Sequence, residues 1–405
     1  MAKRAKTPRP GQRAEILMRR RNLKMAQSSH AYVRGSTARF YEWLEDSKGK
    51  LPAGPSIWIC GDCHVGNLGP LADSKAHVDI QIRDLDQAVI GNPAHDLIRL
   101  GLSLGSAARG SDLSGVTTAL MLEEMIEGYQ QSLAGDFDDC KGSTHRPRPV
   151  QLVLEQALKR RWRHLATERI EDVKPTIPLG KRFWELSKAE RRAINELIER
   201  DDVRKLVLGL KQRDSSDPIE IVDAAYWMKG CSSLGRLRYA VLVGIGDADR
   251  DTSSLCLLDL KEAMLPAAPR DTTADMPRDN GQRVVAGARA LAPNLGERML
   301  PARLLDKAVV LRELLPQDLK IDIDRLTRTE AMEAARYLAS VVGLAHRRQL
   351  DNPTAKSWSA ELARNHTKTL DAPSWLWTSV VELVGVHEMA YLDHCRRYAM
   401  GGEDT

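Results

Sequence analysis

The side chains best suited to chemistry in this sequence are two aspartates and an asparagine that lie close together in the chain. Asp62 lies in the run IWICGDCHVGNLG, Asn67 follows it in the same run, and Asp84 ends the run HVDIQIRD. Phosphoryl transfer from a nucleotide needs a carboxylate that accepts a hydroxyl proton and oxygen ligands that hold magnesium on the phosphates. Asp62 suits the first role. Asn67 and Asp84 suit the second, because Mg²⁺ prefers hard oxygen ligands.

Two short strands are predicted to position these residues. SIWIC is typical of a buried strand, bounded by Pro55 and Gly61, and residues 77–84 alternate between apolar and polar side chains like a half-buried strand. Asp62 and Asp84 therefore each follow a strand. Asp86 is expected to be a further metal ligand, with a plain loop carboxylate as the alternative. Asp96, which opens a predicted helix, is expected to cap it or to brace the loop of Asp62.

A glycine-containing segment and a lysine occur much later in the chain. GCSSLG, from Gly230 to Gly235, precedes the predicted strand RYAVLVGIG, and the next predicted strand, SLCLLDLKEA, carries Lys261. A phosphate-covering loop followed by a lysine that reaches the phosphates has this order. We therefore expect Gly230, Ser233, Gly235 and Lys261 to bind the nucleotide, although Ser232 replaces the second glycine of the usual loop.

These segments resemble known proteins. G-D-x-H-x-x-N followed by an apolar strand and D-x-D is similar to the catalytic segment of aminoglycoside-phosphotransferase-type kinases. Over most of its length, from about Tyr32 to Gln349, the chain resembles the bacterial domain-of-unknown-function family 2252, which is grouped with protein-kinase-like folds. The matching stretches are YVRG, CGDCHVGNLG, RDLDQAVIGNPAHDLIRLGLS, GCSSLGRLRY, LLDLKEA, VLRELLPQDLK and GLAHRRQ. The resemblance implies ATP and Mg²⁺ as cofactors.

The order of the segments predicts a circularly permuted, kinase-like α+β fold with two lobes. An ordinary kinase has its glycine-rich loop and lysine before the catalytic loop, whereas here they come after it. Residues 1–130 and 317–405 are predicted to form a large helix-rich lobe. Residues 131–219 are predicted to be a helical connection or insertion, and residues 220–316 a smaller β-rich lobe that covers the nucleotide.

Composition limits the other possibilities. The chain has 405 residues with a net charge of +5, which requires neither a nucleic-acid nor a membrane partner. No apolar run approaches the roughly 20 residues that span a bilayer. The basic clusters at residues 17–24 and 157–164 are interpreted as solvated helix faces. The six cysteines are scattered apart from Cys60 and Cys63, which favours a reducing, cytoplasmic location.

Several alternatives remain at this stage. Arg34 of YVRG is a candidate phosphate or carboxylate contact, and His346 of GLAHRRQ is expected to be a core or capping histidine. Cys60 and Cys63 lack the context of a redox pair or a zinc site. The same scaffold could carry a nucleotidyl transferase or a nucleotide-binding pseudokinase. The D-x-H form of residues 62–64 also allows a metallophosphoesterase, which would need several histidine ligands. The phosphate acceptor is not specified.

Overall fold

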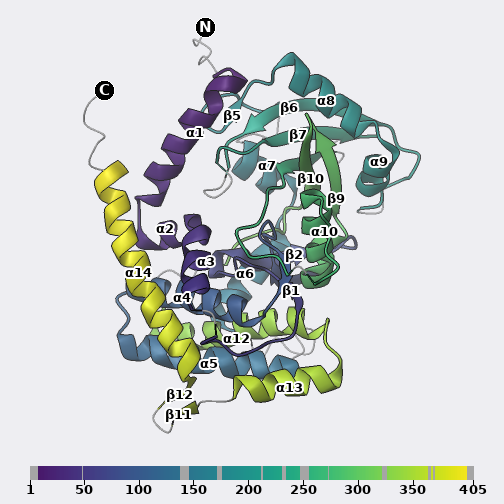
Figure 1. Ribbon diagram of the computed structural model, residues 1–405. Coiled ribbons are helices and arrows are strands. Elements are labelled where there is room, and N and C mark those ends of the chain that lie inside the picture. The colour runs from purple at the N-terminus through teal and green to yellow at the C-terminus, as the bar shows by residue number, and fades with distance from the viewer. Residues whose placement is uncertain are drawn as a thin grey trace.

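The structure is a computed structural model that describes residues 8–47, 49–136, 146–170, 176–210, 213–229, 234–246, 255–271, 273–321, 326–363, 366–367 and 370–398. It is a mixed α+β protein in which a six-stranded sheet lies at one end and a helical lobe at the other (Figure 1). The predicted combination of a helix-rich part and a β-rich part is therefore confirmed.

The six-stranded sheet is antiparallel throughout, in the order β5-β6-β7-β8-β10-β9. Its strands are β5 (Phe183–Trp184), β6 (Ile219–Trp227), β7 (Arg238–Ile245), β8 (Leu255–Glu262), β9 (Met299–Leu304) and β10 (Lys307–Leu314). The helices near it are α1 (Pro10–Met25), α7 (Trp162–Ile170), α8 (Lys188–Ile198), α9 (Asp201–Leu208), α10 (Asn280–Leu291) and α11 (Pro293–Gly296). β6 and β9 were not predicted, whereas β7, β8 and β10 were.

Both faces of this sheet are buried, so its central strands are apolar on both sides. Alternate side chains of β7 and β8 join two separate clusters: Val241 and Leu258 pack with α8 and α9, whereas Leu242 and Leu257 pack with α7. This alternation follows from the period of two of a β-strand. It also decides which polar residues of the sheet share a face, as described below.

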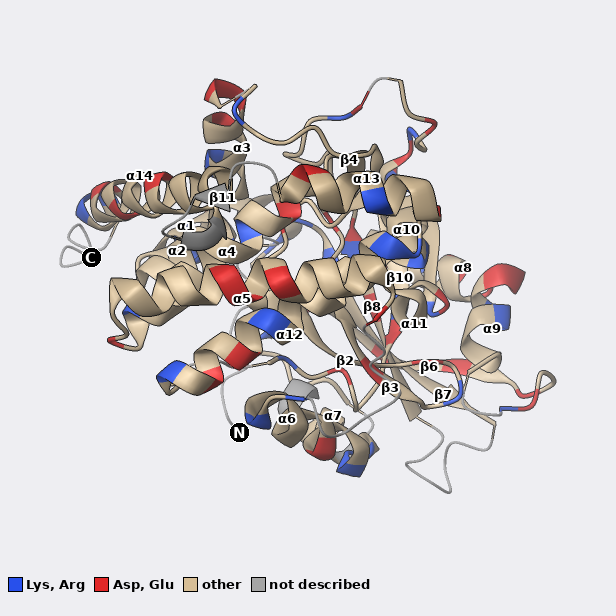
Figure 2. Ribbon diagram, turned by 90° about the horizontal axis from the view of Figure 1, so that it is seen from below, with Lys and Arg blue, Asp and Glu red and all other residues tan. Residues whose placement is uncertain are grey.

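The helical lobe is organised around α5 packed along α12, and α4 packs against both of them (Figure 2). Its helices are α2 (Ser29–Gly35), α3 (Thr37–Asp46), α4 (Ala94–Gly110), α5 (Gly115–Ala134), α6 (Arg148–Lys159), α12 (Arg328–Arg347), α13 (Asn352–Leu362) and α14 (Ser374–Tyr398). Glycines allow the close approach of α5 and α12. A Cβ atom at Gly128 would lie 2.2 Å from the carbonyl oxygen of Arg336, and one at Gly343 would lie 2.9 Å from that of Tyr129.

The other strands form small two-stranded ladders. β1 (Ile57–Ile59) pairs with β4 (Val89–Gly91), β2 (Leu68–Ala72) with β3 (Val78–Ile82), and β11 (His366–Thr367) with β12 (Leu370–Pro373). A 3₁₀ turn (Val65–Asn67) precedes β2. β3 was predicted to be half-buried; on its polar face Asp79 is partly exposed, whereas Gln81 is covered. Gln81 is buried and accepts a hydrogen bond from the backbone N–H of Asn294, 3.2 Å away.

The segment that leaves the sheet after β10 crosses the β2–β3 ladder on its way to α12. Arg83 donates to the carbonyl of Asp318 (3.3 Å), and Arg298 forms a buried ion pair with the Asp318 carboxylate (3.0 Å). A Cβ atom at Gly69 would lie 2.4 Å from the carbonyl oxygen of Leu319, so only glycine allows this close crossing. This contact fixes the sheet against the loops that carry Asp62 and Asp84.

Some predicted boundaries differ from the observed ones. The N-terminal part of the predicted helix-rich lobe begins with three separate helices, α1, α2 and α3, and its C-terminal part is interrupted by β11 and β12. Within the predicted connection, β5 pairs with β6. The fold class assigned as kinase-like and permuted, and the domain limits at 131, 220 and 317, stay predictions.

The close approach at Gly128 provides a test of the packing. Gly128→Ala is expected to lower the free energy of unfolding by about 1–3 kcal/mol, the usual cost of overpacking a core. Gly115→Ala on the same helix is the matched control, because nothing lies within 4 Å of a Cβ atom there. Chemical denaturation of both variants would measure the difference. An equally stable Gly128→Ala protein would contradict the α5–α12 packing.

Candidate active site

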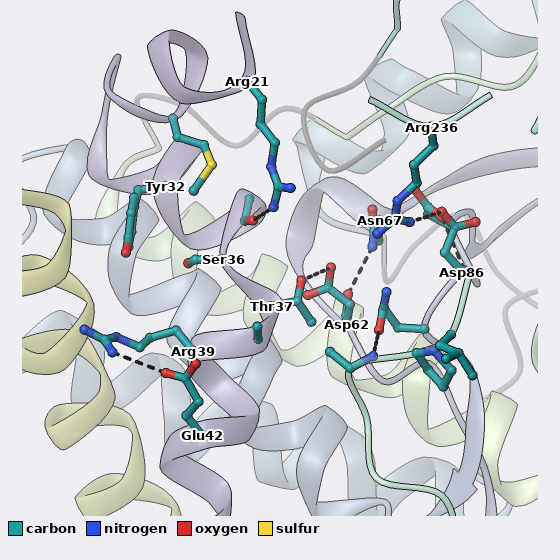
Figure 3. Close-up of a pocket in the computed structure, with 18 residues that line it drawn as sticks. Arg21, Tyr32, Ser36, Thr37, Arg39, Glu42, Asp62, Asn67, Asp86 and Arg236 are labelled. Atoms are coloured by element: carbon teal, nitrogen blue, oxygen red, sulfur yellow. Dashed lines mark hydrogen bonds and ion pairs between the residues drawn. The ribbon is translucent and has the colours of Figure 1, made fainter. Parts of the chain in front are cut away.

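A cavity of about 500 Å³ brings the predicted residues together at the junction of the two lobes (Figure 3). Asp62, Asn67, Asp84 and Asp86 all line it. Its remaining walls come from the N-terminal helices and from the segments around Arg236 and 265–267. The grouping that the sequence predicted for Asp62, Asn67 and the two later aspartates is therefore observed in space.

Asp62 is held in a defined orientation. Arg99 Nε donates to Asp62 Oδ1 (2.8 Å), and Thr37 Oγ1 donates to Asp62 Oδ2 (2.9 Å). Burial raises the pKa of the Asp62 carboxyl, although Arg99 and Thr37 oppose this shift. Gly61, just before it, has φ +72°, and a Cβ atom there would lie 2.2 Å from the carbonyl oxygen of Gln87. Glycine is therefore required at the turn that presents Asp62.

A fully buried carboxylate, Asp96, braces this turn from below. Its two oxygens accept the backbone N–H groups of Cys60 (2.7 Å) and Gly61 (2.9 Å). His346 Nε2 lies 3.2 Å from Asp96 Oδ2, and His346 Nδ1 lies 2.8 Å from the hydroxyl of Tyr129. The brace predicted for Asp96 is confirmed; the N-cap of α4 is Pro93 instead. His346 is a buried core residue, as expected.

Asn67 lies at the floor of the cavity, close to Asp62. Its side-chain nitrogen donates to the backbone carbonyl of Asp62 (3.0 Å). The backbone carbonyl of Asn67 accepts the backbone N–H of Arg83 (2.7 Å). The side chain thereby ties the two ends of the loop between β1 and β2. The backbone bond to Arg83 also links this loop to the residue preceding Asp84.

Lys261 joins the sheet to the aspartates of the helical lobe. Its ammonium nitrogen lies 3.3 Å from Asp84 Oδ1 and contacts Asp86 Oδ2. Burial raises the pKa of Asp84, but Lys261, Arg312 and Arg238 outweigh it and hold the pKa below its usual value. Burial and the neighbouring Asp84 raise the pKa of Asp86. The lysine and the aspartates, which are distant in sequence, thus form one ion cluster.

The sheet face around Lys261 carries further charges. Arg238 on β7 pairs with Asp259 on β8 (2.5 Å), and Arg312 on β10 lies 3.4 Å from the same carboxylate. The strand period places all of them on the Lys261 side of the sheet. Glu262 points to the opposite face, where it accepts the N–H of Leu237 (2.8 Å).

The glycine segment before β7 is described only at its end. Gly235 has φ +94°, a left-handed conformation that favours glycine. Arg236, the next residue, extends toward Asp86, with 3.8 Å between its Nη1 and the Asp86 carboxylate (Figure 3). Gly230 and Ser233 lie outside the described residues. Arg236, which directly follows this segment, therefore supplies a cation at the cavity wall.

The oxygen ligands at the cavity fit magnesium. The Asp84 side chain is 40% exposed and lies beside Asp86 and Asn67, which gives carboxylate and carboxamide oxygens at one wall. Mg²⁺ is commonly held by one or two carboxylates together with substrate phosphates. Over the described residues, no group of three or more His, Cys, Asp and Glu side chains is arranged to bind a metal by itself. The donor set thus suits a metal that phosphates help to bind.

The other candidate residues from the sequence contribute to the packing around the Asp62 loop. The Arg34 guanidinium lies against Gly66: a Cβ atom at Gly66 would be 3.1 Å from the Cζ atom of Arg34. Cys60 and Cys63 are buried free thiols. Burial, together with Arg34 and Arg99, holds the pKa of His64 well below its usual value, so this histidine is neutral. These residues form the surroundings of the Asp62 loop.

Sequence reasoning missed the residues that position the predicted ones. These residues come from four separate parts of the chain: Thr37, Arg99, Arg236 and Arg283. Arg283 donates to the backbone carbonyl of Asp86 (2.9 Å). Arg99 follows Asp96 by one helical turn, so both face the loop. That spacing was a usable signal, because a charged pair within the apolar run HDLIRLGLSL needs buried partners.

Residues 13–397 match the family described as "Uncharacterized protein conserved in bacteria (DUF2252)". The chain is thus an α+β protein with a polar cavity between a sheet and a helical lobe, and it belongs to this bacterial family. Neither the curated proteins nor the solved structures include a match to it. In the described part of the chain, no helix is both long enough and apolar enough to cross a membrane.

The brace beneath Asp62 can be tested by Asp96→Asn. An amide supplies only one acceptor oxygen, so a buried N–H of Cys60 or Gly61 would lose its partner. We expect a loss of about 3 kcal/mol in the free energy of unfolding, since a hydrogen bond to a buried charged group is removed. Asp351→Asn is the control: Asp351 caps α13 through the N–H of Thr354 (2.8 Å), and asparagine caps equally well. Equal stability of the two variants would contradict the brace.

Proposed function

We propose that this protein is an ATP- and Mg²⁺-dependent phosphotransferase with a kinase-like arrangement, acting on a hydroxyl acceptor. The observation that carries the proposal is that Asp84 and Asp86, which both pair with Lys261, line the same cavity as Asp62 and Asn67. Phosphoryl transfer uses this set of groups: a base for the hydroxyl, metal ligands, and a lysine for the phosphates.

The succession of strands in the sheet supports the same proposal. The glycine segment connects β6 to β7, and Lys261 lies on β8, the third strand in this succession. Protein kinases also carry their phosphate-binding lysine on their third strand, and the glycine-rich loop precedes that strand in the chain. α10 follows β8, but its sequence, NGQRVVAGARAL, contains no glutamate for the usual ion pair. Asp84 and Asp86 are the carboxylate partners of Lys261 instead.

Asp62 is the proposed general base. The acceptor oxygen attacks the γ-phosphorus, its proton passes to an Asp62 oxygen, and the bond from the γ-phosphorus to the bridging oxygen of ADP breaks. The burial that raises the pKa of Asp62 makes it a better proton acceptor. Arg99 and Thr37 fix the carboxylate, so little reorientation is needed during the reaction.

Asp84 and Asn67 would hold Mg²⁺, with Asp86 beside them. Bound magnesium neutralises charge that develops on the phosphates. Lys261 and Arg236 both approach the Asp86 carboxylate and would bind phosphate oxygens. The ammonium of Lys261 already reaches the Asp84 carboxylate, so it is close to where phosphates on an Asp84-bound metal must lie.

The other functions considered for this sequence receive less support. A two-metal phosphoesterase needs several histidine ligands, whereas the described residues that line the cavity include no histidine, and the nearby His64 is buried beside arginines. A nucleotidyl transferase would use the same cavity with the nucleotide reversed. It differs from a kinase in releasing pyrophosphate, so the reaction product separates the two.

Nucleotide binding is the first test. Mg-ATP should raise the melting temperature of the wild type, because a ligand that binds only the folded state stabilises it by about 2.7 kcal/mol at a hundred times its Kd. Asp84→Ala should lose the magnesium dependence of this shift. Asp393→Ala, at an exposed surface ion pair on α14, is the control and should keep it. Differential scanning fluorimetry with and without Mg²⁺ measures the effect; a wild type insensitive to Mg-ATP would refute the proposal.

Catalysis is tested by Asp62→Asn, which keeps the shape of the side chain and removes the base. We expect kcat to fall by about 10²–10⁴, the usual contribution of general base catalysis, with little change in ATP binding. The readout is ADP formation with the acceptor present, measured in parallel with pyrophosphate release. Pyrophosphate as the product would assign a nucleotidyl transferase, and wild-type turnover in Asp62→Asn would remove Asp62 from the mechanism.

A further inference from the structure

The half of the cavity formed by the N-terminal helices has no role in the mechanism above. α1 contributes Arg21 to it, α2 contributes Tyr32, and α3 contributes Arg39 and Glu42. Figure 3 shows these residues on one side of Asp62, with Asp86 and Arg236 on the other. Because the second side holds the proposed metal and phosphate ligands, an acceptor must reach Asp62 from the helical side.

The wall on this side is attached directly to the base. Thr37, in the first turn of α3, donates to Asp62 (2.9 Å), and Ser36 to Arg39 line the cavity beside it. A compound that binds against α1, α2 and α3 is therefore placed at a fixed position relative to the Asp62 carboxylate. Such positioning is what a phosphate acceptor needs.

The charges on this wall are not balanced. Arg39 is paired with Glu42 (3.2 Å). Arg21 donates only to a backbone carbonyl, that of Gly35 (3.0 Å), and its Nε is buried without a hydrogen-bond partner. Within the described part of the chain, no carboxylate lies at ion-pair distance from Arg21. The acceptor half thus carries one guanidinium whose charge no acidic side chain compensates.

We infer that the acceptor is a small hydroxyl compound that also carries a carboxylate or phosphate group, and that Arg21 binds this group. The inference rests on the proposed function. A guanidinium binds both anions through paired N–H donors. A polycationic acceptor such as an aminoglycoside would be repelled by Arg21 and Arg39. The carboxylate of Glu42, which could attract such an acceptor, is already paired with Arg39. The volume of about 500 Å³, which must also admit the phosphates of the nucleotide, restricts the acceptor to a small molecule.

The test uses labelled phosphate transfer to a fractionated metabolite mixture. A bacterial small-molecule extract is separated on an anion exchanger into bound and unbound fractions, and each is incubated with the protein, Mg²⁺ and ATP labelled at the γ-phosphate. We expect labelled products from the bound fraction. Arg21→Gln should raise the KM for the purified acceptor at least about tenfold, the effect of losing one charged hydrogen bond. Arg21→Lys, which keeps the charge, should recover part of the loss.

Arg19→Gln is the matched control, since Arg19 is exposed on the same helix and should behave like the wild type. The stabilisation by Mg-ATP should be unchanged in all variants, which separates acceptor binding from damage to the fold. Transfer to the unbound fraction, an unchanged KM in Arg21→Gln, or loss of Mg-ATP stabilisation in that variant would overturn the inference. So would absence of transfer to either fraction while Mg-ATP still stabilises the wild type. If Mg-ATP does not stabilise the wild type, the proposed function fails and the inference fails with it.

Discussion

The geometry of the cavity depends on one buried carboxylate. Asp96 accepts two consecutive backbone N–H groups, those of Cys60 and Gly61, at the point where the chain turns to present Asp62. A carboxylate with no solvent exposure is costly unless its oxygens are satisfied. His346 completes the set from α12. Because α4 carries Asp96 and α12 carries His346, the loop of Asp62 is fixed to the core of the helical lobe.

The opposite wall is organised by charge rather than by backbone hydrogen bonds. Lys261 and Arg236 face Asp84 and Asp86 across the junction of the lobes. Behind them, Arg238 and Arg312 pair with Asp259 within the sheet. Burial alone would raise the pKa of Asp84, yet the cations keep it ionised. Such paired charges keep carboxylates available to a metal ion and cations available to phosphates. When neither ligand is bound, each carboxylate and its partner cation stabilise each other's charged form.

The sequence predicted the polar centre better than its surroundings. Asp62, Asn67 and Asp84 lie within one continuous stretch, so their strand and loop signals were local. Thr37 reaches Asp62 through tertiary packing, which no local pattern specifies. The spacing of Asp96 and Arg99 indicates that Arg99 has a buried partner, but not that this partner is Asp62. Arg21 carries no local signal either, because its helix looks like an ordinary basic helix in the sequence.

Among the strands that were not predicted, β2, β6 and β9 show why their signals were weak. β2 contains Gly69 and Pro70, and β9 contains Pro301, residues that weaken a strand signal. Pro301 is tolerated because β9 is the edge strand of the sheet. β6 is irregular at Ile221–Asp223, where its pairing with β7 shifts register. Such an interruption breaks the alternation by which a strand is recognised.

The packing of α5 against α12 has a consequence for the synthesis of the chain. These helices form the centre of the helical lobe, yet every strand of the six-stranded sheet lies between them in the sequence. As the chain leaves the ribosome, the apolar faces of α4 and α5 emerge long before α12 can cover them. Contacts between such distant segments form slowly, and the uncovered surface is prone to aggregate in the meantime. The nascent protein thus has its greatest need of chaperones during the translation of the sheet.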